Sequence, residues 1–200
     1  ALAYLSRELY TEGLLGFLND AKSNTRSLYC AFYELHHLPF AKELKDVKAK
    51  AKNLEIVYSA QPGQNKDHGH DPLKGKGNKD TLKDAGLLSV SHPRTKANQP
   101  HNKFMVMCEM QGGTEVPIEV WTGSTNITLS GIYGQSNTGH RIRDKQLAAK
   151  YKEYWDKLKE NPDLSALSTV SMTIQPRTDL TKLQSGNFVF FSPRDIPTPS

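Results

Sequence analysis

The sequence has no long apolar run. Nowhere does it approach the ~18 consecutive apolar residues that a membrane-spanning helix needs, and only 36% of its 200 residues are hydrophobic. Charged residues make up 24% and the mean hydropathy is -0.60, which is typical of a soluble globular chain and excludes a fibre or a membrane protein. No secretory leader is visible either, so we expect a cytoplasmic location. The chain begins at Ala1 without an initiator Met, and we therefore expect a processed protein or a fragment.

Cysteine and clustered carboxylates are also scarce. The two cysteines, Cys30 and Cys108, both lie in apolar runs, so we expect buried reduced thiols and leave a disulfide open. No cluster of acids is suited to Mg²⁺. A His-Gly-His stretch, His68 to His70, is too weak a pattern to predict a metal site. We therefore expect neither a metal nor a cofactor.

Positive charge is in mild excess. The formal net charge is +5 and the pI about 9.1. That balance suits an anionic partner such as nucleic acid or a lipid headgroup, without choosing between them. An ordinary lysine-rich surface has the same balance.

Helical and strand-like segments alternate along the chain. Helical spacing of apolar residues predicts helices at 8–22, 38–52, 81–90 and 143–160. Short apolar runs predict strands at 27–35, 53–60, 103–109 and 116–122. A Gly-, Pro- and Lys-rich loop is expected at 61–80, and a turn-rich region after Asn161 that contains one strand at 187–191. This order predicts an α/β layered fold with a mixed sheet flanked by helices on both faces.

Polar residues lie at the start of one of these strands and just after the end of the next. His101 and Lys103 start one strand and, two residues apart, share a face. Ser124 and Asn126 follow the next strand, and a hairpin would bring the four together. An imidazole, an ammonium, a hydroxyl and an amide are the groups that a phosphoryl centre calls for. A surface pair followed by an ordinary Gly-Ser turn is the alternative.

His-Asn-Lys at 101–103 followed by Gly-Ser-Thr-Asn at 123–126 resembles the signature of the phospholipase D superfamily. The segments around them, from residue 10 to 160, resemble bacterial phospholipase D-like proteins. The resemblance implies a phosphodiesterase that uses no metal. It implies that His101 attacks phosphorus to form a phosphohistidine and that Lys103 binds the phosphate oxygens.

The same resemblance assigns the phosphate pocket to Ser124, Asn126 and Asn137. Asn137, in Gly-Gln-Ser-Asn, falls where the family often has a further polar residue; a capping or turn role is the alternative. Cys108 stands where the family has aspartate. By strand parity its neighbour Glu109 shares the face of His101, so we expect Glu109 in a supporting role.

A second His-x-Lys is also lacking. Family active sites combine two such motifs, one of which protonates the leaving group. We therefore predict a phospholipase D-like domain at 1–160, and at 161–200 a linker with the possible start of an absent second half. The partner would be that half in a longer chain or a homodimer copy. The predicted function is hydrolysis of a phospholipid or nucleic-acid phosphodiester; the alternative is a non-catalytic half-site that binds phosphate or nucleic acid.

Overall fold

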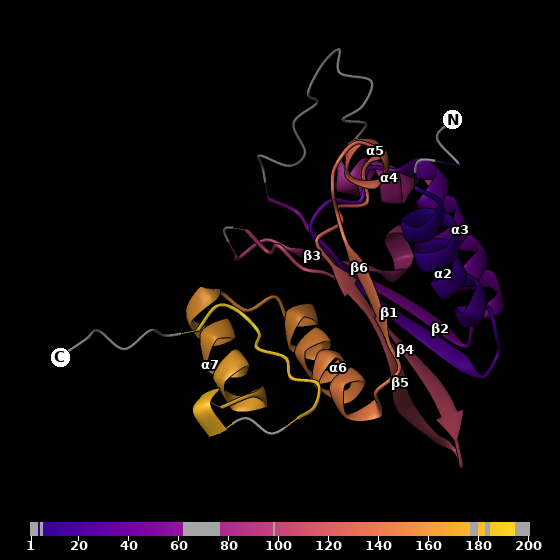
Figure 1. Ribbon diagram of the computed structural model, residues 1–200. Coiled ribbons are helices and arrows are strands. Elements are labelled where there is room, and N and C mark those ends of the chain that lie inside the picture. The colour runs from indigo at the N-terminus through magenta and orange to yellow at the C-terminus, as the bar shows by residue number, and fades with distance from the viewer. Residues whose placement is uncertain are drawn as a thin grey trace.

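A mixed six-stranded sheet forms the centre of the molecule (Figure 1). The computed structural model describes residues 4, 6–61, 77–97, 99–176, 180–182 and 185–194. The strands are β1 (Arg26–Phe32), β2 (Asn53–Ser59), β3 (Ser91–Arg94), β4 (Lys103–Gln111), β5 (Thr114–Gly123) and β6 (Gly139–Ile142). They lie in the order β3-β2-β1-β4-β5-β6. β1, β2 and β3 are parallel, whereas β4, β5 and β6 each pair antiparallel to a neighbour, so the predicted mixed sheet is confirmed.

Helices cover both faces of this sheet, as predicted (Figure 1). One layer contains a π-helical segment (Arg7–Leu15), α2 (Gly16–Ala21), α3 (Leu38–Lys50) and α4 (Asn78–Asp84). The other contains α6 (Lys145–Lys159) and α7 (Leu164–Ile174). The short α5 (Leu129–Tyr133) follows β5, and 3-10 turns lie at Leu88–Val90 and Leu180–Lys182.

Successive residues of β1 enter two different cores. Leu28, Cys30 and Phe32 pack against α2 and α3, while Tyr29 and Ala31 pack toward α6. This alternation is the period-2 pattern of a strand buried on both faces. It explains why the run around residue 30 is apolar throughout.

The two cysteines lie on opposite faces of the sheet. Cys30 belongs to the core under α3 and Cys108 to the core under α6, and both are free thiols. Burial raises the pKa of both, that of Cys108 to about 12. The expectation of buried reduced thiols is confirmed.

The region after Asn161, expected to be turn-rich, contains helix α7. Asp163 caps it, since its carboxylate accepts a hydrogen bond from the Ala166 amide at 2.9 Å. This stretch is rich in serine and threonine, so its sequence does not indicate a helix. Leu167 and Ile174 of the helix nevertheless pack into the α6 core. The expectation of a turn-rich region is therefore wrong here, because the cap and the apolar packing stabilise a helix.

The strand predicted at 187–191 is also wrong. This segment has no strand structure and lies on the helical layer, where it has no sheet edge to pair with. Phe191 stacks on Tyr154 of α6 with ring centroids 4.1 Å apart and an interplanar angle of 8°. The Tyr154 hydroxyl donates to the Ser192 carbonyl oxygen at 2.8 Å. Aromatic packing and one hydrogen bond therefore fix this segment to α6.

Most of the 61–80 loop lies outside the described residues, including His68 and His70. Within the described part of the chain, every helix is too short or too polar to cross a membrane.

We expect Trp155→Phe to lower the free energy of unfolding by about 2 to 3 kcal/mol, measured by urea denaturation. The Trp155 indole is buried and donates to the Cys30 carbonyl oxygen at 2.7 Å, so the change removes this bond together with part of a buried ring. Trp121→Phe is the matched control. Trp121 is equally buried, but its indole donates no hydrogen bond within the described residues. Equal losses for the two variants would show that the Trp155 bond adds no stability.

Candidate functional site

The β4–β5 hairpin brings the two halves of the motif together. Gly112 and Gly113 form its two-residue turn, both with positive φ (59° and 85°), as a tight hairpin requires. At the open end Phe104 pairs with Thr122, which sets Lys103 beside Gly123. The hairpin predicted from the sequence is therefore confirmed.

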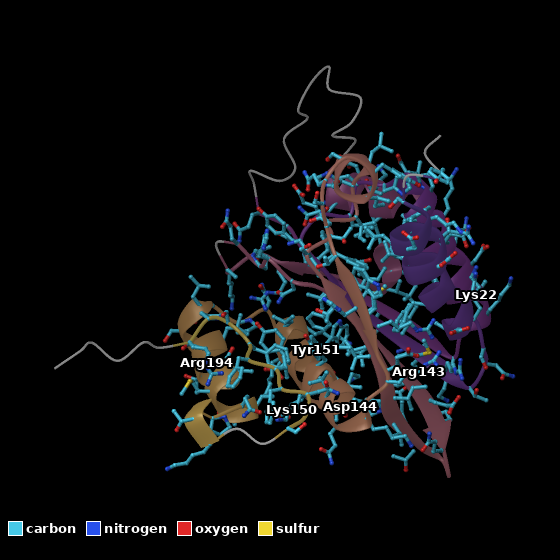
Figure 2. The ribbon with its side chains drawn as sticks, in the orientation of Figure 1. Lys22, Arg143, Asp144, Lys150, Tyr151 and Arg194 are labelled. Carbon is cyan, nitrogen blue, oxygen red and sulfur yellow. The ribbon has the colours of Figure 1, made fainter. Side chains whose placement is uncertain are left out.

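A pocket of about 510 Å³ lies at this open end. One wall comes from the start of β4, the end of β5 and α6; the other comes from α7 and the segment after it. Figure 2 shows Tyr151 on α6 near the sheet and Arg194 beside α7. The lining includes Gln99, His101, Asn102, Lys103, Phe104, Thr122, Gly123, Tyr151, Tyr154, Leu164, Leu167, Val189, Phe190, Phe191 and Ser192.

His101 and Lys103 meet around the ring of Tyr33. The His101 imidazole is exposed and packs on that ring at 4.4 Å between centroids, tilted by 60°. Lys103 is only 7% exposed, and its Nζ lies 5.0 Å from the same ring centre. Nζ also donates to the His101 carbonyl oxygen at 3.3 Å. The two predicted reactive groups therefore share one immediate environment.

Burial sets the charge of both groups. It lowers the pKa of Lys103 from 10.5 to about 8, against the opposing effect of the Glu34 carboxylate. Burial, with the Lys103 charge second, also lowers the pKa of His101, again opposed by Glu34. At neutral pH the imidazole is therefore mostly neutral and has a free lone pair, while the ammonium keeps its charge.

Ser124 and Asn137 are bonded to each other. The Ser124 hydroxyl donates to Asn137 Oδ1 at 3.0 Å and accepts from the Thr138 amide at 3.0 Å. Asn137 Nδ2 donates to the Gly131 carbonyl oxygen at 2.8 Å. Neither residue lines the pocket. In the structure as it stands, both hold the turn after β5 against the start of β6.

Gly123 is required by this turn. A Cβ at that position would lie 2.1 Å from the Thr138 carbonyl oxygen, far inside contact distance. The Gly-Ser pair of the motif thus has a structural reason that needs no ligand.

Asn126 differs from its neighbours because its side-chain oxygen is buried and has no hydrogen-bond partner among the described residues. Its backbone neighbour Ile127 donates to the Glu34 carbonyl oxygen at 3.0 Å, and Ile127 pairs with Leu35. Asn126 therefore lies beside the segment that follows β1, and Tyr33 belongs to the same segment. A buried polar atom with no protein partner is suited to a ligand.

Glu109 is not brought to the site. It shares the face of Lys103, and Cys108 packs on the opposite face with Phe104, as strand parity predicted. Six residues of strand nevertheless separate Glu109 from Lys103, which is roughly 20 Å. The Glu109 carboxylate instead accepts from Arg26 Nε at 2.9 Å, and this bond lowers its pKa.

Tyr33, Glu34 and Asn78 contribute to the site and were not identified from the sequence. They lie at least 25 residues from Lys103 in the sequence, and no spacing links them to it. The described residues contain no group of three His, Cys, Asp or Glu side chains that could hold a metal ion.

Known proteins give one family match. The family model "Cardiolipin synthase, PLD-like domain" matches residues 14–159, so α7 and the segment after it lie beyond the match. Curated proteins give no match.

Solved structures give fold matches. A phospholipase D family member, Nuc from Salmonella typhimurium, is 19% identical with a TM-score of 0.51, covering 74% of this chain and 85% of that one. NucT from Helicobacter pylori is 20% identical with a TM-score of 0.50, covering 76% and 92%. At this identity both matches establish the fold alone.

Lys103 should destabilise the fold that holds it. Because its pKa is lower in the folded state, folding is penalised below about pH 8, and the penalty disappears as the pH rises toward 10.5. We expect Lys103→Met to raise the free energy of unfolding by about 1 to 3 kcal/mol at pH 7, with a smaller gain at pH 10. Lys42→Met, at an exposed position on α3, is the control and should change little. A Lys103→Met variant no more stable than the parent would contradict the burial penalty.

Proposed function

The chain belongs to the phospholipase D superfamily, and on that basis we propose that it is a phosphodiesterase in which His101 is the nucleophile. The observation that carries the proposal is the shared environment of His101 and Lys103. A neutral imidazole beside a buried ammonium supplies an attacking lone pair and a cation for the phosphate oxygens.

The proposed reaction has two steps. The imidazole nitrogen of His101 forms a bond to phosphorus while one ester oxygen leaves and takes a proton from a general acid. Water then gives a proton to the conjugate base of that acid and attacks phosphorus, the P–N bond breaks, and His101 is released as the neutral imidazole. Lys103 and the Asn126 amide would hold the non-bridging oxygens. The resemblance also assigns Ser124 and Asn137 to the phosphate site; since neither lines the pocket in this structure, their mutual bond would have to open for a phosphate oxygen to reach them.

The general acid would come from a second His-x-Lys outside this sequence, because the sequence contains a single such motif and its histidine is the nucleophile. We propose that a second half of a longer chain, or a second copy, presents it across the pocket. The alternative function is a half-site that binds a phosphate group without turning it over. The two differ in whether the pocket ever receives that second histidine.

The pocket favours a phosphodiester with an apolar substituent over a nucleic-acid strand. Among its described lining residues Lys103 is the single lysine, and arginine is absent. A nucleic-acid groove follows several phosphates with several cations and offers free aromatic faces for base stacking. Here most of the rings contact one another: Phe191 stacks on Tyr154, and Tyr151 meets both Phe104 and Phe191 edge-on. Phe190 is exposed, with the Arg194 guanidinium over its ring. A phospholipid fits this combination of one cation and apolar walls.

In the complete enzyme, with the second His-x-Lys present, we expect His101→Ala to lower turnover of bis(p-nitrophenyl) phosphate by at least about 10³-fold, since the nucleophile is lost. EDTA should leave parent activity unchanged. His92→Gln is the matched control, because His92 lies on β3 and bonds to Glu55 at 3.0 Å, away from the pocket. Parallel assays with phospholipid vesicles and an oligonucleotide identify the substrate class. A His101→Ala variant within twofold of the parent would remove His101 from the nucleophile role.

A second prediction concerns the acid. A positioned general acid contributes ~10²–10⁴-fold. If a second copy supplies it, specific activity should fall on dilution below the dimer dissociation constant, as measured by sedimentation together with an activity titration. If a missing half supplies it, this chain alone should show little turnover at any concentration. A monomer with full, dilution-independent turnover contradicts both, and His140 would then be the first candidate acid to replace.

A further inference from the structure

Asn78 uses its whole side chain to hold the end of β1. It is fully buried, and its Oδ1 accepts from the Leu35 amide at 2.7 Å. Its Nδ2 donates to the carbonyl oxygens of Tyr33 at 2.7 Å and Ser59 at 2.8 Å. Both amide hydrogens and the amide oxygen are thus bonded to backbone groups. The backbone on each side of Glu34 is fixed by a residue more than forty positions away in the sequence.

Two hydrogen bonds fix the backbone of Tyr33, and the bond from Asn78 to its carbonyl oxygen is the first. Its amide donates to the Asn102 carbonyl oxygen at 2.7 Å, directly between His101 and Lys103. The backbone of Tyr33 is therefore fixed from α4 on one side and from the motif on the other. Its ring contacts the imidazole at 4.4 Å and lies 5.0 Å from the ammonium.

We propose that Tyr33 is a positioning residue for His101 and Lys103, and that Asn78 keeps it in place. The effect on turnover rests on the proposed phosphodiesterase function; the effect on the two side chains does not. Within the described residues, the exposed imidazole makes no side-chain hydrogen bond, and its ring contact is with Tyr33. That contact restricts the orientation from which the imidazole can attack.

The same ring acts differently on Lys103. An aromatic face attracts an ammonium, which favours one direction of the long side chain. The ring also covers part of the imidazole and lies beside the buried ammonium, in keeping with burial as the main cause of their lowered pKa values. Glu34, on the same loop, opposes both shifts. One residue thus orients the nucleophile and the cation and sets their shared solvation.

Ordinary core packing does not account for Tyr33. It belongs to neither hydrophobic core, although Phe32 belongs to the core under α3. The side chain is half-buried, so its removal should leave the fold intact.

The test compares Tyr33→Ala with Tyr33→Phe in the full chain, by NMR titration of the His101 ring and by steady-state kinetics. Spectra of His101→Gln assign the resonance. Tyr33→Ala should raise the pKa of His101 by about 0.5 or more, because the part of the imidazole that the Tyr33 ring covers becomes open to water. It should also lower kcat about 10- to 100-fold with KM changed less than about threefold. Tyr33→Phe keeps the ring face and should match the parent in both.

Asn78→Ala should also raise the pKa of His101, as Tyr33→Ala does, because it releases the Tyr33 backbone. Thr81→Ala, a change at another buried polar residue of α4, is its control and should leave the titration unchanged. A Tyr33→Ala variant with parental titration and parental kcat overturns the proposal, as does a Tyr33→Phe variant that behaves like Tyr33→Ala. If parent and variants turn over no substrate even when a second His-x-Lys half is supplied, while Tyr33→Ala still raises the pKa, the positioning role stands and the proposed function fails. If turnover requires His101 but is indifferent to Tyr33, the function stands and the positioning role fails.

Discussion

The register of the β4–β5 hairpin is the constraint on which the candidate site depends. Because Phe104 pairs with Thr122, the start of one strand and the end of the next meet at the same sheet edge. Residues that follow β1 then bridge the two: Tyr33 bonds to Asn102, and Glu34 and Leu35 pair with Ile127. A shift of one residue in this pairing would turn Lys103 to the opposite face and separate it from the Tyr33 ring.

Burial gives this edge its chemical character. A lysine in water is a hydrated point charge, whereas Lys103 is 7% exposed and has little solvent to screen it. Partial burial, with the Lys103 charge second, also lowers the pKa of the neighbouring imidazole and so favours its neutral form. The cost of holding a charge in this position is met by the packed sheet and its two helical layers. Active sites commonly trade stability for reactivity in this way.

Sequence periodicity predicted the parts of the fold in which local and tertiary preferences agree. The four central strands, the hairpin and α6 have clear periods and were found, and strand parity placed Cys108 on the face opposite Lys103. Parity carries no information on distance, so Glu109 was assigned to a site roughly 20 Å away. Helix α7 was missed because its serines and threonines resemble a loop until packing is known. Tyr33 and Asn78 were missed because only the folded topology brings them to the motif.

The tight space around Gly123 affects which motif residues can indicate activity in related sequences. The Thr138 carbonyl oxygen excludes any larger residue at this position, and Ser124 is bonded to the same turn. Natural selection for folding alone would therefore preserve Gly-Ser in a descendant that had lost all chemistry. A relative that keeps Gly-Ser but has replaced His101 or Lys103 would keep this turn and lack a residue of the proposed chemistry. In evolutionary comparisons of this lineage, the two halves of the motif are thus unequal evidence for activity.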